Sequence, residues 1–436
     1  MMPAHRALRG RILSFAGDPA EVGEAASHVY FEDGIVLVED GRIAARGDAA
    51  EMLRKLPEGT PVDDHAGHLI LPGLIDTHIH LPQTQVIASH GAQLLDWLQK
   101  YTFVEEQRFA DPAHAARIAR FFLDELLRNG TTTAAVYGSV HAESADALFA
   151  EAELRGTRTI AGKVMMDRGA PAALLDTAER GYRESKALIE RWRGRGRLHY
   201  AVSPRFAVTS SDAQLEAAGA LLAEHPACYL QTHLCENQDE IAAVRRLFPW
   251  ATSYTDVYDH FGLLGERSLF GHCIHLEEAE RERLSASRSI AALCPTSNLF
   301  LGSGLFDLAA LRRADRPVRV AFATDVGGGI SYSMLRTAAE AYKVAQLRGQ
   351  RWSALEAFYA ITLGNARALG LEAAIGNLEP GTEADMVVLD ARATAAMAHR
   401  METVRTLAEE LFVLLIMGDE RAVRATYVMG ELVARV

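Results

Sequence analysis

Two histidines separated by one residue are the first feature of this chain whose spacing suggests chemistry. His78 and His80 end the apolar run 69–77, which predicts a buried strand. Side chains at positions i and i+2 of a strand point to the same face, so the two imidazoles lie side by side. Neutral imidazole is the commonest metal ligand in proteins and suits zinc or iron. The pair predicts half of a metal site, with two structural histidines as the alternative.

Other ligand-type residues follow three further apolar runs. They are His233 after residues 228–232, His272 after residues 268–271 and Asp325 after residues 318–324. Polar residues at the carboxyl ends of successive strands fit a site on the rim of a parallel barrel. A single strand-end His or Asp usually only hydrogen-bonds the next loop, but four such strand ends together predict a metal site.

A catalytic zinc ion usually has three protein ligands and a position for water, and it sometimes becomes five-coordinate. His78, His80, His233 and Asp325 supply such a set, and Asp325 is expected to bind most loosely. A metal ion held there would lower the pKa of a bound water to about 7 and make hydroxide available at neutral pH. The predicted chemistry is therefore attack by water.

Two more residues are candidates for holding or moving protons. Glu236 lies three residues after His233 and can take the proton of the water, unless it is an ordinary acid at the start of a helix. His272 is either a further ligand or the group that holds the water and the developing oxyanion. His275 competes for this role, but His272 is preferred because it ends the apolar run. Glu236, His272 and Asp325 are the catalytic candidates.

We expect one metal ion per chain. Some metal-dependent barrels bridge two metal ions with a carboxylated lysine at the end of the fourth strand. Lys163 falls in the third expected strand, and the fourth ends at Arg205 and Phe206. Lys163 is better interpreted as a structural lysine or one that pairs with a loop. The Pro-Cys-x-x-Cys signature of the zinc deaminases that act on bases is not matched after Pro295.

Eight strand candidates with mostly helical connections follow one another along the chain. They are the run ending at His80 and residues 131–137, 159–166, 199–206, 227–235, 269–274, 289–294 and 318–324. This alternation predicts an α/β fold, a (β/α)₈ TIM-type barrel. Residues 111–128 predict one of its helices, with Asp111 as the N-cap and Pro112 at the first helical position. The apolar stripe expected on that helix is Ile118, Phe121, Phe122 and Leu126.

The two ends of the chain lack the alternation of strands and helices and instead predict strands. Residues 34–43 predict a hairpin around Asp40-Gly41, and residues 384–389 and 425–433 predict further strands. We expect one small β domain built from residues 1–70 and 376–436, with the barrel between them at 71–375.

Composition narrows the class of protein. The 436 residues are 49% hydrophobic and 23% charged, as in ordinary soluble proteins, and the net charge of −12 argues against nucleic acid and anionic membranes as partners. The apolar run 411–417 is too short to span a bilayer, and the first residues do not suggest a signal peptide. The four cysteines show no framework spacing, which favours reduced thiols in the cytoplasm.

Several stretches taken together resemble a known family. Residues 71–80, with the sequence LPGLIDTHIH, resemble the first-strand motif of the amidohydrolase superfamily. The resemblance extends to the guanine deaminase family through residues 94–103, 129–133, 162–167, 204–206, 231–237, 294–299, 331–335 and 375–377. The first motif is specific to the superfamily, and the whole set is specific to the family.

This resemblance implies a zinc-dependent aminohydrolase of purine catabolism that converts guanine to xanthine and ammonia. It implies zinc at His78, His80, His233 and Asp325, Glu236 as proton shuttle and His272 beside the water, while the ligand types leave iron possible as the native metal. It also implies a homodimer. It further implies that Gln83 and Arg205 hydrogen-bond the purine edge and that Phe206 packs on the ring. By position alone, these three are more often loop and packing residues.

Three other functions stay open from the sequence. The chain could deaminate another amino-purine or a pterin, it could hydrolyse a ring amide, or it could be an inactive barrel that only binds a purine. The intact ligand set and Glu236 argue against the inactive barrel.

Overall fold

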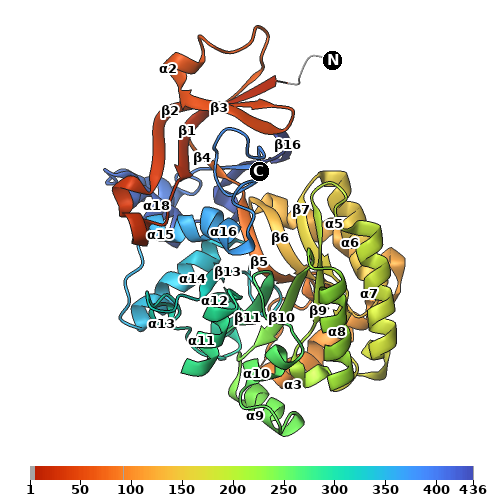
Figure 1. The fold of residues 1–436 in the computed structure, drawn as a ribbon. Helices are drawn as coiled ribbons and strands as arrows, with labels where there is room; N and C mark the ends of the chain where they lie inside the picture. Colours follow the sequence, from red (N-terminus) through yellow and green to blue (C-terminus); the bar gives the residue numbers. More distant parts are fainter. Residues whose placement is uncertain (1–4, 92, 436) are drawn as a thin grey trace.

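The structure is a computed structural model that describes residues 5–91 and 93–435. Its larger sheet has eight parallel strands in the order of the chain, and a short strand, β8 (Val164–Met165), pairs with one of them (Figure 1). The eight are β5 (Leu74–His80), β6 (Thr131–Tyr137), β7 (Arg158–Gly162), β9 (Leu198–Pro204), β10 (Tyr229–Leu234), β11 (Ser268–His272), β12 (Ile290–Leu293) and β13 (Arg319–Phe322).

The segment that follows the last strand, β13, meets the carboxyl end of the first strand, β5. The N–H of Asp325 donates to the carbonyl oxygen of His78 (2.9 Å), and the N–H of His80 donates to that of Val326 (3.0 Å). These hydrogen bonds bring the segment after β13 against β5, so the sheet curves into a nearly closed barrel. The predicted (β/α)₈ class is confirmed.

Each barrel strand contributes one buried side chain to a layer inside the barrel. The layer consists of Ile75, Ala135, Ile160, Ala201, Tyr229, Leu269, Ile290 and Ala321. Helix α16 (Asn365–Leu369) covers this layer at the amino ends of the strands, where the hydroxyl of Tyr229 donates to the carbonyl oxygen of Leu369 (2.8 Å). Because this layer fills the interior at the amino ends of the strands, a site inside the barrel can open at their carboxyl ends.

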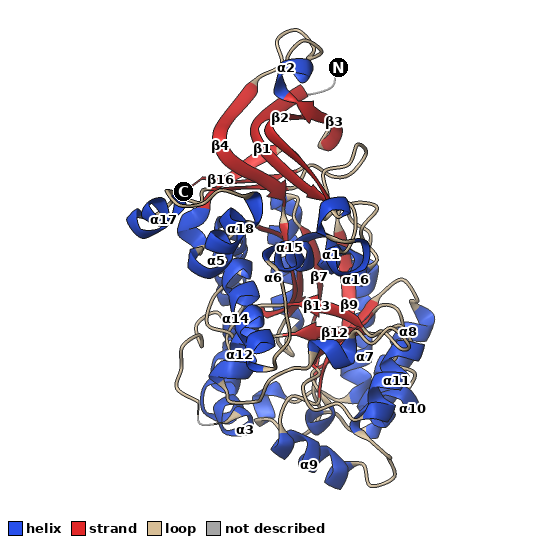
Figure 2. Cartoon of the chain, turned by 90° about the vertical axis from the view of Figure 1, so that its left-hand side faces the viewer, coloured by secondary structure: helices blue, strands red, loops and turns tan. Residues whose placement is uncertain are grey.

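Helices surround the barrel, as Figure 2 shows. The longer ones are α5 (Pro112–Arg128), α6 (Ala142–Arg155), α7 (Ala178–Trp192), α8 (Asp212–Glu224), α9 (Gln238–Leu247), α11 (Glu278–Ala286), α14 (Met334–Leu347) and α18 (Leu407–Met417). The shorter ones are α1 (Pro19–Val22), α3 (Leu94–Trp97), α4 (Phe103–Glu106), α10 (Tyr254–His260), α12 (Pro295–Phe300), α13 (Leu308–Leu311), α15 (Ala354–Tyr359) and α17 (Ala395–Met401). Helix α2 (Ala49–Met52) lies away from the barrel, on the smaller sheet (Figure 1). Within the described ranges, no helix is long and apolar enough to cross a membrane.

Helix α5 has the bounds and the cap that the sequence predicts. The side chain of Asp111 accepts a hydrogen bond from the N–H of Ala113 (2.9 Å). Ile118, Phe122 and Leu126 are buried, but Phe121 is 47% exposed, so its place in the apolar stripe was wrong. Successive helical residues are turned by about 100°, which carries position 121 away from the face that 118, 122 and 126 share.

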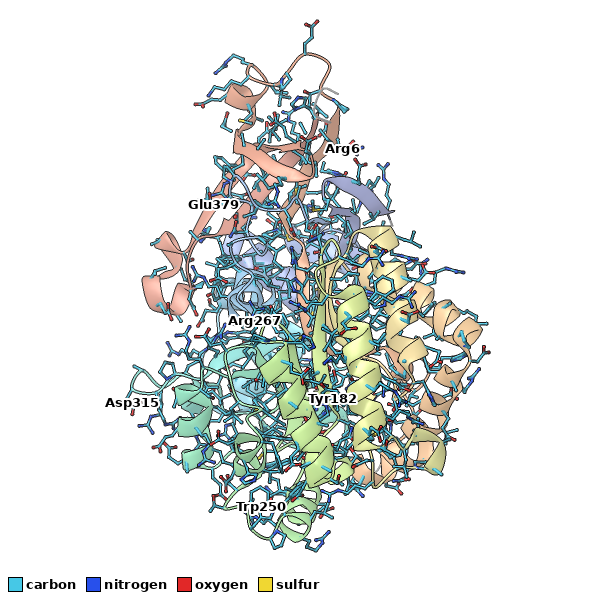
Figure 3. The ribbon with its side chains drawn as sticks, turned by 45° about the vertical axis from the view of Figure 1, so that its right-hand side comes forward. Arg6, Tyr182, Trp250, Arg267, Asp315 and Glu379 are labelled. Carbon is cyan, nitrogen blue, oxygen red and sulfur yellow. The ribbon has the colours of Figure 1, made fainter. Side chains whose placement is uncertain are left out.

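A second sheet of seven strands is built from both ends of the chain, in the order β16–β15–β14–β4–β1–β2–β3. Its strands are β1 (His5–Phe15), β2 (His28–Glu39), β3 (Arg42–Asp48), β4 (Val62–Pro72), β14 (Met386–Leu389), β15 (Val423–Val428) and β16 (Glu431–Arg435). This small sheet, marked by Arg6, lies at the opposite end of the molecule from Trp250, which follows α9 (Figure 3). The predicted division lies at residues 70/71 and 375/376, although β4 continues past it and pairs Leu71 and Pro72 with β14.

Two turns in the small sheet differ in how visible they are in the sequence. Asp40 and Gly41 join β2 to β3 with φ of 48° and 78°, as the predicted hairpin requires. Met429 and Gly430 also have positive φ, 50° and 78°, and reverse the chain between β15 and β16. The single strand expected at 425–433 was therefore wrong. A methionine is a poor signal for a turn, since non-glycine residues seldom adopt positive φ.

Candidate active site

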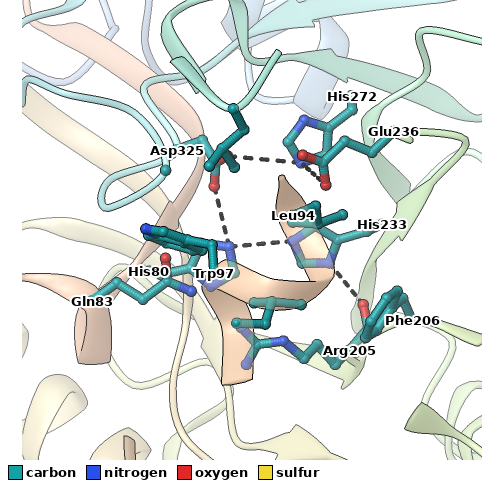
Figure 4. A pocket seen from close by; sticks show the side chains of 13 residues that line it. His80, Gln83, Leu94, Trp97, Arg205, Phe206, His233, Glu236, His272 and Asp325 are labelled. Atoms are coloured by element: carbon teal, nitrogen blue, oxygen red, sulfur yellow. Dashed lines mark hydrogen bonds and ion pairs between the residues drawn. The ribbon is translucent and has the colours of Figure 1, made fainter. Parts of the chain in front are cut away.

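The side chains of His78, His80, His233 and Asp325 converge at the carboxyl end of the barrel, and all four are buried. Figure 4 shows three of them, His80, His233 and Asp325. Nε2 of His80 lies 3.3 Å from Nε2 of His78 and 3.3 Å from Nε2 of His233. Oδ1 of Asp325 lies 3.3 Å from Nε2 of His78 and 3.2 Å from Nε2 of His80. The structure thus brings together all four residues predicted as metal ligands.

These distances fit a metal ion. Ligand atoms about 2.0–2.1 Å from a tetrahedral zinc ion lie about 3.3 Å from one another, which is the spacing seen here. Burial lowers the pKa of His80 to about 3 and holds the pKa of His233 well below its ordinary value, so both imidazoles are neutral. Nδ1 of His233 lies 2.7 Å from the carbonyl oxygen of Arg205, a partner that leaves Nε2 with its lone pair toward the cluster.

Cys294 offers an alternative fourth ligand with His78, His272 and Asp325. Burial raises the pKa of the Cys294 thiol well above its ordinary value. Because the thiolate is the form that binds metal, the set containing the three histidines and Asp325 is the better donor set.

Glu236 and His272 face each other beside this cluster. Nε2 of His272 lies 3.3 Å from Oε2 of Glu236 and 3.7 Å from Oδ2 of Asp325. Burial, and then the nearby Asp325 carboxylate, raises the pKa of Glu236 to about 8. A carboxyl group with this pKa can both take and give a proton near neutral pH.

The side chains of His272 and His275 point in different directions. Nδ1 of His272 lies 2.8 Å from Oδ1 of Asn298, which leaves Nε2 of His272 pointing toward Glu236. Nε2 of His275 instead lies 2.7 Å from the carbonyl oxygen of Ser303, and His275 does not line the cavity. Of these two histidines, His272 is the one that lines the cavity and faces Glu236.

The backbone turns sharply where these side chains leave the strands. Cys235, His272 and Asp325 have φ of 52°, 71° and 52°, a left-handed conformation that is unfavourable for residues other than glycine. Such strained residues cluster at functional sites, where the surrounding structure holds them. This conformation turns the side chains of His272 and Asp325 toward the cavity.

One cavity joins the cluster to the predicted substrate residues. It is lined by His80, Gln83, Leu94, Trp97, Leu98, Arg205, Phe206, His233, Glu236, His272, Leu301, Asp325 and Gly328. The side-chain oxygen of Gln83 accepts a hydrogen bond from the N–H of Gly327 (3.1 Å), which leaves its NH₂ group for the cavity. Arg205 and Phe206 directly follow β9, while Trp97 and Leu94 come from α3 (Figure 4).

Known proteins with the same fold and related sequences identify the family. The profile of the amidohydrolase family matches residues 69–433, and that of a bacterial imidazolonepropionase-like composite domain matches residues 36–58. The chain is 48% identical to guanine deaminase of Escherichia coli K12, covering 98% of this chain and 97% of that protein. It is 42% identical to a probable guanine deaminase of Deinococcus radiodurans, covering 98% of each. The chain belongs to the amidohydrolase family.

Solved structures agree with this placement. The E. coli guanine deaminase superposes with a TM-score of 0.96 over 99% of each chain. A protein described as guanine deaminase from C. acetobutylicum with bound guanine in the active site is 27% identical with a TM-score of 0.87, over 99% of this chain and 100% of that one. The expected resemblance to the amidohydrolases and to guanine deaminases is confirmed, and this amidohydrolase is a metal-dependent hydrolase.

Lys163 lies outside the cavity of this amidohydrolase. Its ammonium group pairs with Asp176 and, at 3.0 Å, with Glu184, and its side chain is fully buried. These pairs agree with the structural interpretation of this lysine.

Three residues near the site were not predicted from the sequence. Asn298 contacts His272, the hydroxyl of Ser303 donates to Oε1 of Glu236 (3.0 Å), and Glu106 contacts Arg205. None of them ends an apolar run or has metal-ligand spacing. Asn298 alone lay in a stretch, 294–299, that the family resemblance singled out.

Proposed function

We propose that this amidohydrolase converts guanine and water to xanthine and ammonia. We call His78, His80, His233 and Asp325 the metal-type cluster. The observation that carries the proposal is one cavity that three of them, His80, His233 and Asp325, line together with Glu236, Arg205 and Gln83. Relatives described as guanine deaminases over nearly the whole chain support the same substrate. The C. acetobutylicum relative described with guanine in its active site supports it as well.

His78, His80, His233 and Asp325 would hold one zinc ion per chain, or else iron, since both metals accept imidazole and carboxylate ligands. When bound, the metal supplies hydroxide at neutral pH. Nε2 of His272 lies between Glu236 and Asp325 and can hold the attacking oxygen and the charge that develops on it.

Glu236 carries the protons of the reaction. It takes a proton from the water as the oxygen attacks the purine carbon that bears the amino group. It then gives that proton to the neighbouring ring nitrogen. The hydroxyl group now on the carbon gives up its own proton, which Glu236 passes to the amino group, so the C–N bond breaks, ammonia leaves and the carbonyl of xanthine forms. The raised pKa of Glu236 suits a group that accepts and donates in turn.

Arg205 and Gln83 select the substrate. Both present N–H donors to the cavity, and guanine offers a ring carbonyl oxygen and ring nitrogens as acceptors. Adenine has an amino group in place of this carbonyl, so its donor would face the donors of Arg205. Phe206, at the cavity wall, supplies an apolar face for the ring.

A substrate panel tests the proposal. Metal-loaded protein is incubated with guanine, adenine and a pterin, and ammonia and the purine product are measured. Ammonia and xanthine from guanine alone are expected. Ammonia from another compound but not from guanine would favour the alternative deaminases, and guanine binding without ammonia would favour the inactive barrel.

The proposal includes a homodimer in the cytoplasm. The cytoplasmic assignment is supported by Cys228, Cys235, Cys273 and Cys294, which are all buried free thiols. The homodimer rests on the family resemblance. Sedimentation equilibrium should give twice the chain mass of 47.6 kDa, and a single species at the chain mass would contradict the dimer.

A further inference from the structure

Glu106 is a buried carboxylate that the proposed reaction does not use. It is the last residue of α4, and its side chain is fully buried. Among the described residues, the cation that contacts it is Arg205, whose side chain is only 3% exposed. A buried carboxylate without a partner would be costly, so Glu106 and Arg205 depend on each other.

The contact between the two side chains is end-on. Both carboxylate oxygens of Glu106 lie 2.8 Å from the same nitrogen of Arg205, Nη1. A guanidinium has five N–H donors, of which two are on Nη1. Nε and Nη2, with the other three, make no hydrogen bond to any described residue and remain for a ligand in the cavity that Arg205 lines.

The pair is also held in place. The guanidinium of Arg205 lies over the ring of Phe103, with 5.4 Å from Cζ to the ring centroid. Phe103 and Glu106 are both in α4, so one short helix supplies the ring and the carboxylate. The carbonyl oxygen of Arg205 lies 2.7 Å from Nδ1 of His233, which ties the same residue to the metal-type cluster.

We propose that Glu106 is a positioning residue that aims Arg205 and cancels its charge, so that the cavity prefers neutral oxopurines over anionic ones. This inference rests on the proposed function, because it concerns the same purine cavity. With Glu106 in place, Arg205 offers hydrogen bonds without net charge. With a neutral residue at 106, the buried guanidinium would keep its charge and favour an anion as its partner.

The test compares two oxopurines of similar shape, neutral hypoxanthine and urate, which is an anion at neutral pH. Their affinities for the metal-loaded protein are measured by titration calorimetry for the wild type and for Glu106→Gln. The charges of the metal-type cluster are the same in both proteins and cancel in the comparison. We expect the ratio of urate to hypoxanthine affinity to rise at least about tenfold in Glu106→Gln. We also expect KM for guanine to rise.

Glu105→Gln is the matched control. Glu105 is the neighbour of Glu106 in α4, and its substitution removes the same charge. The carboxylate of Glu105, however, pairs with Arg108 on the surface (2.7 Å). Its affinity ratio should equal that of the wild type. The double variant Glu106→Gln/Arg205→Met, which leaves no unpaired charge, should bind guanine weakly without gaining urate affinity.

An unchanged affinity ratio in folded, metal-loaded Glu106→Gln would overturn the inference, as would a urate gain that persists in the double variant. If Glu106→Gln does not fold, a urate gain in the double variant would still overturn the inference, because that gain cannot come from Arg205. If the wild type deaminates guanine but the affinity ratio is unchanged in Glu106→Gln, the role of Glu106 is refuted and the proposed function stands. A wild type that does not act on guanine would refute the proposed function instead.

Discussion

Gly271 sits so close to His78 that a single methyl group there should disable the metal-type cluster. A Cβ at position 271 would lie 2.5 Å from Cε1 and 2.9 Å from Nδ1 of His78. Carbon atoms in contact normally lie about 3.5–4.0 Å apart, so the ring would have to move by about 1 Å. The ring cannot move freely, because Tyr137 and His272 lie at centroid distances of 4.8 and 5.5 Å.

The size of the effect follows from this displacement. A misplacement of about 1 Å in a catalytic site costs roughly 10²-fold in rate, and overpacking costs about 1–3 kcal/mol of stability. We therefore predict that Gly271→Ala folds, holds less than one metal ion per chain and loses about 100-fold in kcat/KM for guanine. Metal analysis of the purified variant, thermal unfolding and steady-state kinetics measure the three quantities.

Gly265→Ala is the control for this prediction. A Cβ at position 265 would meet only the hydroxyl of Ser268, at 3.8 Å, which is ordinary contact. This variant should keep full metal content and activity. Normal metal content and normal kcat/KM in Gly271→Ala would refute the view that His78 is a metal ligand whose ring needs the space that glycine leaves at position 271.

Three other predictions concern the proposed chemistry. Glu236→Gln should keep metal and bind guanine but lose about 10²–10⁴-fold in kcat, and near-normal turnover by the metal-loaded variant would exclude a proton-carrying role. Arg205→Ala should lose most of its efficiency with guanine, through KM, at full metal content; a variant that loses its metal instead would show that Arg205 serves the cluster and not the substrate. Chelation should abolish ammonia release and zinc should restore it, whereas full activity in chelator would contradict metal-dependent hydrolysis.

The barrel was predictable because its signals are local. Each strand is a short apolar run, and the polar residue that ends it marks the carboxyl end, so the order of the runs gives the order of the strands. The same reasoning anticipated that His78, His80, His233 and Asp325 meet, since the ends of parallel strands share one edge. The hairpin at Asp40-Gly41 carries an equally local signal.

The remaining features depend on contacts between distant segments. Glu106 lies 99 positions from Arg205, and Ser303 lies 67 positions from Glu236. No periodicity links such residues, and a buried acid looks like an exposed one in sequence. The left-handed backbone of His272 and Asp325 is likewise held by the folded barrel and leaves no trace in residue type.

Reaction in ¹⁸O-labelled water tests the central claim most directly. The metal-loaded protein is given guanine in labelled water, ammonia is quantified, and the purine product is analysed by mass spectrometry. Hydrolytic deamination predicts one ammonia for each guanine consumed and xanthine that carries one ¹⁸O atom at the carbon that bore the amino group. Guanine left unchanged, or a product formed without ammonia and without the label, would contradict the account.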